Sequence, residues 1–155
     1  FYPYLLKEYR NRWFVYGVRG IGRILQNLAL DRKQSLEVLP QEHYIKNTFF
    51  DPNTFFDDLV GVTKNTGSVA EKVGFKVAAA EAPYIITKPI HRSQQVMERL
   101  ADGSVILEIE VVINHELERV FFGYAEGIQV LYPKTLVELM GRKLKKAAEQ
   151  YTHSK

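Results

Sequence analysis

The sequence contains no cysteine, so a disulfide framework, a thiol nucleophile and a thiolate metal site are all excluded. It also lacks an apolar run near the roughly 20 residues that a membrane-spanning helix needs. No basic stretch followed by an apolar leader opens it. No two of its four histidines lie at the i, i+4 spacing of a helical metal pair. These absences predict a cytoplasmic protein with no cofactor, no metal and no membrane contact.

Apolar side chains are plentiful, and charge is unevenly distributed. Hydrophobic residues make up 46% of the 155 residues, which is enough to bury a core. Residues 1–33 carry seven Lys or Arg against two Asp or Glu, a local balance of +5, whereas the whole chain has a net charge of +3. The remaining residues therefore sum to −2. This asymmetry favours an anionic partner for the N-terminal part.

The first 62 residues are expected to form a small β-barrel with a trailing helix. Residues 2–10 and 12–19 are β-prone and flank Asn11, which favours a tight hairpin. Residues 24–32 and 35–40 continue the meander, and both faces of the second strand are largely covered by apolar side chains, which favours a barrel over a one-sided sheet. Residues 53–60 have apolar side chains at helical spacing, with Asp51 or Asn53 as the cap.

Residues 63–70 are mostly polar and are expected to be a linker. The elements predicted over 71–155 follow the order βαββαβ and end in a further helix, an order typical of a ferredoxin-like sandwich. The predicted strands cover 71–78, 91–100, 104–113 and 128–133; the predicted helices cover 79–89, 114–127, where Asn114 is the cap, and 133–151. The fold class is therefore α+β.

Catalytic chemistry finds little support in the sequence. His91 and Ser93 lie two apart on a predicted strand and share a face, but no glycine-flanked nucleophile turn or orienting acid accompanies them. Asp57 and Asp58 are adjacent in a predicted helix, so their carboxylates point apart. We therefore expect a protein that is not an enzyme, with His91 and Ser93 on an exposed polar strand face.

Two stretches of the N-terminal part resemble the WYL domain. These are PYLLKEYRNRWFVYG, residues 3–17, and NLALDRKQSLEVL, residues 27–39. The family is named after a Trp-Tyr-Leu triplet, which stands here as Trp13, Phe14 and Val15, so the tyrosine hydroxyl is missing. A second match is LALDR at 28–32. The residues after about 71, with the stretch 100–136, are similar to the C-terminal extension domain, WCX, that follows WYL in bacterial transcription regulators.

The resemblance implies a fold, a partner and a role. WYL domains are Sm-like, SH3-type small barrels, the extension is ferredoxin-like, and an upstream winged helix-turn-helix binds promoter DNA. That DNA-binding domain is not in this sequence, which begins with Phe1, so a fragment of a longer regulator is expected. Relatives form homodimers and sense nucleic-acid or nucleotide signals through the WYL surface. The resemblance places Tyr4, Arg12, Trp13, Asn27 and Arg32 in the ligand site, with Arg10 and Arg19 at its rim.

The residue types agree with an anionic ligand. Forked arginines hold phosphates and flat aromatic rings stack on bases, and the first hairpin offers both. Alternatives stay open: Trp13 packs in the barrel core, and Arg32 pairs with Asp31 or Glu37. The basic stretch 142–146 either complements the dipole at a helix C-terminus or forms a second phosphate-binding patch.

Two functions follow. The first is a ligand-sensing and dimerisation module, in which single-stranded nucleic acid or a nucleotide binds the N-terminal barrel and biases the orientation of the upstream DNA-binding domain. The second is a constitutive protein-protein interaction module that needs no ligand.

Overall fold

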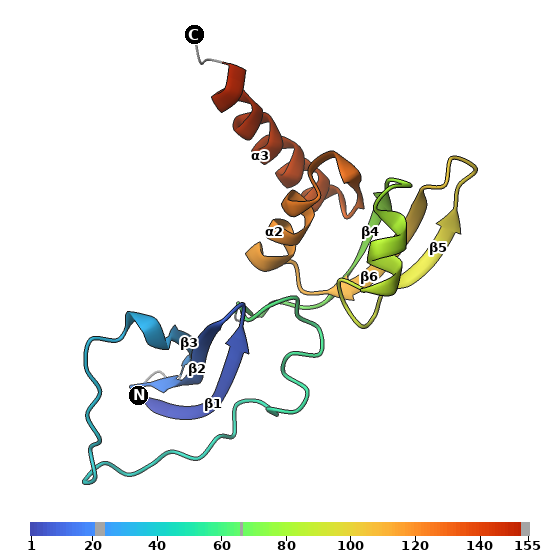
Figure 1. Ribbon diagram of the computed structural model, residues 1–155. Helices are drawn as coiled ribbons and strands as arrows, with labels where there is room; N and C mark the ends of the chain where they lie inside the picture. Colours follow the sequence, from blue (N-terminus) through green and yellow to red (C-terminus); the bar gives the residue numbers. More distant parts are fainter. Residues whose placement is uncertain (21–23, 66, 153–155) are drawn as a thin grey trace. The chain divides into compact units, whose positions relative to one another are not determined.

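The computed structural model describes residues 1–20, 24–65 and 67–152. The chain divides into two compact units, Phe1–Gly67 and Ser68–Lys155 (Figure 1). Within the described ranges the fold is mixed α+β, with one antiparallel sheet in each unit and three α-helices, all in the second unit. None of the helices in these ranges is both long and apolar enough to cross a bilayer.

The first unit is built on a three-stranded antiparallel sheet in the order β1-β2-β3. Its strands are β1 (Tyr2–Tyr9), β2 (Arg12–Arg19) and β3 (Ile24–Ala29). The turn residues Arg10 and Asn11 have φ values of 51° and 60°. A two-residue turn with left-handed backbone at both central positions has a twist that matches the twist of the two flanking strands. The tight hairpin predicted around Asn11 is thus confirmed.

Two local predictions in this unit are wrong. No strand forms over 35–40: after a short 3₁₀ turn, η1 (Leu30–Arg32), the chain is an exposed loop in which Leu36 and Val38 are 84% and 86% exposed. A strand needs a hydrogen-bonded neighbour, and no described strand pairs with these residues. Closure into an Sm-like, SH3-type barrel therefore stays a prediction.

The segment predicted as a helix over 53–60 is instead a series of turns. Its start is stabilised as expected, because the Asp51 side chain accepts the Asn53 amide at 2.9 Å. The α-helical bonding does not propagate, however, because the bond from the Phe55 amide to the Asp51 carbonyl is followed by i, i+3 bonds, from Asp57 to Thr54 and from Leu59 to Phe56. Asp57 and Asp58 also lie where the negative end of a helix dipole would be.

The second unit has the predicted alternation of strands and helices. Its four-stranded sheet has the order β5-β6-β4-β7, and every neighbouring pair is antiparallel. Side chains on one face of the sheet, including Val73, Phe75 and Ile109, are fully buried together with Phe121 of α2. The elements are β4 (Glu71–Val77), α1 (Ala82–Thr87), β5 (Gln95–Arg99), β6 (Val105–Val111), α2 (His115–Gly123), the 3₁₀ turn η2 (Ala125–Gly127), β7 (Ile128–Tyr132) and α3 (Lys134–Thr152). The predicted cap of α2 is confirmed, because the Asn114 side chain accepts the Leu117 amide at 2.9 Å.

A hydrogen-bonded network crosses the other face of this sheet. Tyr132 of β7 donates its hydroxyl to Glu108 of β6 at 2.6 Å, and Lys72 of β4 lies 3.0 Å from the same carboxylate. These contacts lower the pKa of Glu108, the tyrosine hydrogen bond being the larger cause. Gly74 permits the arrangement, since a Cβ at that position would lie 2.1 Å from the Tyr132 ring.

The network predicts a pH dependence of stability. Because the pKa of Glu108 is lowered on folding, its stabilising contribution is present above its ordinary pKa and is lost as the pH falls through the folded-state value. We expect Glu108→Gln to flatten the acid limb of a plot of unfolding free energy against pH, measured by urea denaturation. Glu110→Gln, two residues away on the same strand, is the matched control. An equally steep acid limb in Glu108→Gln would contradict this role.

Candidate functional site

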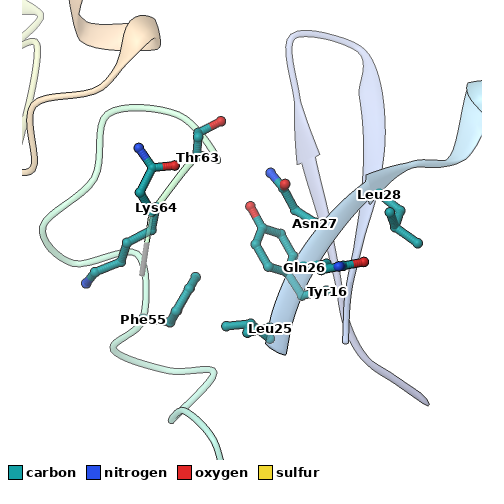
Figure 2. A pocket seen from close by; sticks show the side chains of 9 residues that line it. Tyr16, Leu25, Gln26, Asn27, Leu28, Phe55, Thr63 and Lys64 are labelled. Atoms are coloured by element: carbon teal, nitrogen blue, oxygen red, sulfur yellow. The ribbon is translucent and has the colours of Figure 1, made fainter. Parts of the chain in front are cut away.

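A cavity of about 290 Å³ lies in the first unit, between β3 and the returning segment 55–65. Figure 2 shows Asn27 and Tyr16 on the side of the sheet, and Phe55, Thr63 and Lys64 on the facing segment. Four consecutive residues of β3 line the cavity, so it runs along the outer edge of this strand, which has no other strand beside it in the described sheet. The lining residues are Tyr16, Leu25, Gln26, Asn27, Leu28, Phe55, Thr63, Lys64 and Asn65.

The backbone carbonyl of Val62 fixes the facing wall. The hydroxyl of Tyr16 donates to this oxygen, and the side-chain amide of Asn27 donates to it at 2.9 Å. Val62 and Tyr16 are each only 2% exposed. The Tyr16 ring also packs edge-on against Phe55 at 5.7 Å between ring centroids. Both walls are therefore held in place before any ligand arrives.

The lining is polar but nearly neutral. Its one charged side chain, Lys64, lies 2.7 and 2.8 Å from the two carboxylate oxygens of Asp58 and 5.4 Å from the centre of the Phe55 ring. Within the described part of the chain, the amides of Gln26 and Asn65 have no side-chain hydrogen bond. Such a lining suits a planar group with its own donors and acceptors beside an aromatic ring better than it suits a bare phosphate.

Asn27 is the only one of the seven predicted site residues that lines this cavity. Tyr4 lies on β1, where its ring contacts Tyr44, Phe49 and Phe50 at 6.0 to 6.4 Å between centroids. The Tyr44 hydroxyl in turn donates to a β1 carbonyl, that of Pro3, at 2.8 Å. Tyr4 thus belongs to a cluster that attaches the loop 44–50 to the sheet.

Three of the predicted arginines lie in or near the β1–β2 turn. Arg10, in the turn, has its guanidinium 5.5 Å from the centre of the Tyr9 ring. Arg12 pairs with Asp31 of η1 at 3.0 Å, and both side chains are about half exposed. Arg32 follows Asp31 and makes no ion pair with any described residue. The alternative in which Arg32 pairs with Asp31 or Glu37 is therefore wrong within this part of the chain, and Arg12 pairs with Asp31 instead.

The other two residues are separated from this group. Trp13 is next to Arg12 and therefore projects from the opposite face of the sheet. It is 52% exposed, so the alternative that it packs in a core is wrong. Arg19 ends β2 seven residues after Arg12, about 23 Å along the strand. The structure therefore does not bring the seven predicted residues into one concave site.

Sequence reasoning missed most of the cavity. Phe55, Thr63, Lys64 and Asn65 approach β3 from more than 25 residues further along the chain, and no local motif announces such a long-range return. The signal that was available is Asn27, because an amide within a strand of apolar neighbours requires a hydrogen-bond partner.

The Ser-His pair has a structural role. His91 and Ser93 lie in a turn before β5 rather than on the predicted strand, which begins only at Gln95. The His91 ring is 2.7 Å from the Ser93 hydroxyl, which also accepts the backbone amide of Glu110 at 2.8 Å. The hydroxyl thus secures the edge of the sheet. No group of three or more metal-ligating side chains occurs in residues 1–20, 24–65 and 67–152.

Comparisons with known proteins identify the second unit. The WCX domain family matches residues 70–148. A solved structure that resembles the chain is proteasome accessory factor B/C (PafBC) of Arthrobacter aurescens, with a TM-score of 0.43 and 16% sequence identity. The similarity covers 95% of this chain but only 22% of that protein, so this chain spans about a fifth of its length. None of the curated proteins matches this sequence.

The two bonds to Val62 predict a non-additive loss of stability. Tyr16→Phe and Asn27→Ala each remove one donor, and each should lower the unfolding free energy by about 1 kcal/mol. The double variant should lose more than the sum, because a buried carbonyl is then left without these partners. Trp13 is the only tryptophan and lies in the first unit, so its fluorescence during urea denaturation reports this unit alone.

Gln34→Ala, at an exposed loop amide, is the control for this cycle. If the double variant had the same free energy of unfolding as the less stable of the two single variants, Val62 would not be held by these two donors.

Proposed function

Because this chain belongs to the WCX domain family, we propose that it is the ligand-sensing and dimerisation half of a bacterial WYL-family transcriptional regulator. In this proposal the first unit is the WYL domain, a winged helix-turn-helix on another part of the protein binds promoter DNA, and no bond is made or broken. The signal is an anionic ligand, either single-stranded nucleic acid or a nucleotide, and the regulator works as a homodimer in the cytoplasm.

The finer fold assignments belong to the same proposal. The strand order β5-β6-β4-β7, with antiparallel neighbours and the helices α1 and α2 between strands, supports a ferredoxin-like second unit. For the first unit, the antiparallel meander β1-β2-β3 and the return of the chain along β3 support a small barrel.

The observation that carries the sensing role is the cavity beside β3. The side-chain amides of Gln26 and Asn65 form no hydrogen bond with residues 1–20, 24–65 and 67–152, and the Phe55 ring lines the same cavity. This combination recognises the edge of an unstacked base. Since the cavity itself is nearly neutral, the ligand's phosphates would lie outside it, toward exposed cations of the first unit such as Arg32.

Ligand binding controls the DNA-binding domain only if the ligand binds one dimer arrangement more tightly than another. A ligand that binds two dimer arrangements equally tightly shifts neither. The segment 55–65, which forms one wall of the cavity, is continuous with the boundary between the two units after Gly67. A ligand that alters this wall therefore acts on the stretch of chain that leads to the WCX domain.

One observation favours the second function, a constitutive interaction module. Leu6, Trp13 and Ile24 are 55%, 52% and 59% exposed, and the strand register places all three on the same face of the sheet. An apolar face of this kind is typical of a protein-protein interface.

Ligand titration tests the sensing role. Fluorescence anisotropy with labelled single-stranded oligonucleotides, and competition by linear and cyclic nucleotides, should show saturable binding. Gln26→Ala and Asn65→Ala should each weaken it about tenfold, since each removes a hydrogen bond to the ligand. Arg32→Ala should reduce the dependence of affinity on salt.

Gln41→Ala removes an exposed amide elsewhere in the first unit and should change nothing. Full affinity in Gln26→Ala and Asn65→Ala would remove the cavity from the site. Absence of binding to every oligonucleotide and nucleotide, with dimers observed by light scattering and lost in Trp13→Ala, would favour the interaction module instead.

A further inference from the structure

The helix α3 extends well beyond the body of the second unit (Figure 1). Its first turns are anchored by Leu136 and Met140, which are 1% and 6% exposed. Every residue from 141 to 150 is exposed. Isolated helices shorter than about 12–15 residues are marginal in water, so the projecting part gains little from its own backbone bonds. A structure that projects in this way is stabilised by whatever binds it.

Four cations are concentrated at the base of the projecting part. Lys143 pairs with Glu118 of α2. Arg142, Lys145 and Lys146 make no ion pair with any described residue, and together they define the α3 basic face. The sequence alone allowed these cations to complement the dipole at the helix C-terminus. That explanation is wrong, because the last turn of α3 contains no basic residue and the cations lie in its middle.

The three side chains point in nearly the same direction. At about 100° per residue, Lys145 and Lys146 lie roughly 60° and 40° to either side of Arg142, within about 6 Å along the axis. Like charges at i, i+3 and i, i+4 destabilise a helix. Glu138, the carboxylate one turn before Arg142, is 3.6 Å from Lys134 instead. Glu149 lies on the same side of the helix, one turn after Lys145 and Lys146, but none of the three cations forms an ion pair with a described residue. An anion would therefore stabilise the α3 basic face.

We propose that the α3 basic face binds the phosphate backbone of duplex DNA, without reading the bases. Duplex DNA has one negative charge per roughly 1.7 Å of its axis, so a patch of this length spans several phosphates. The contact needs cations, and the three cations of this face lie within about one turn, with Glu149 one turn further along the same side of the helix. It lies in the second unit and does not depend on the ligand site proposed for the first.

Two other occupants fit less well. A protein interface has an apolar centre, and an interfacial helix buries apolar side chains in the membrane. The exposed apolar residues of the projecting part, Leu144 and Tyr151, lie roughly 180–200° around the helix from Arg142. An occupant that used them would face away from the three cations.

Salt-dependent binding of a labelled duplex of mixed sequence to the full chain tests this inference. A contact with three phosphates contributes about −2.7 to the slope of log K against log salt concentration. The triple variant Arg142→Ala/Lys145→Ala/Lys146→Ala should lose that part of the slope and bind more weakly at about 50 mM salt, while Arg142→Lys should bind normally. The circular dichroism of each variant reports whether α3 remains folded.

The control Lys88→Ala/Arg99→Ala/Arg119→Ala removes three exposed cations of the same unit outside α3 and should keep the slope. An equal loss in this control would show a general charge effect and overturn the assignment, as would an unchanged slope in the α3 triple variant. Binding of anionic phospholipid vesicles, but not duplex, would assign the helix to a membrane instead. Gln26→Ala and Asn65→Ala should leave the duplex slope unchanged, so failure of the ligand-site proposal is distinguishable from failure of this one.

Discussion

The first unit depends on one backbone oxygen. The Val62 carbonyl accepts hydrogen bonds from Tyr16 of β2 and Asn27 of β3, which lie 46 and 35 residues earlier in the chain. These two bonds hold the returning segment beside the outer edge of β3, where an unpaired strand edge would otherwise be exposed. The cavity exists because the segment is held at this point and leaves space around it. The cavity is therefore a consequence of how the unit closes.

The cavity of the first unit and the cations without ion pairs lie in different parts of the described chain. The cavity offers amides and an aromatic ring but little net charge, because Asp58 balances Lys64. Cations that form no ion pair with the part of the chain that the structure describes lie elsewhere: Arg32 follows β3 in the first unit, and the α3 basic face is in the second unit. If both proposals hold, the chain recognises the base of a small ligand in one place and a phosphate backbone in another. The two contacts would then differ in their dependence on salt.

The sequence predicted local structure well wherever neighbouring residues decide it. The hairpin at Asn11, the cap at Asn114 and the strands of the second unit follow from turn, capping and alternation patterns. Residues 35–40 have a strand-like pattern but no partner strand in the described sheet, and residues 53–60 have a helical pattern but form a series of turns. Asn27 was predicted as a site residue, whereas Asn65 was not, because its approach to β3 is a long-range event. Arg12 and Trp13 illustrate a further limit, since adjacency in a strand places side chains on opposite faces.

Hydrogen exchange of the free protein, followed by mass spectrometry, tests directly whether the Val62 contact pre-forms the cavity. Peptides covering 59–64 should exchange more slowly than peptides from the exposed loop 34–42, and replacing both donors to Val62 should remove most of that difference. Equally fast exchange in the two regions of the unmodified protein would show that the wall is not held, and that the cavity is not a feature of the unliganded chain.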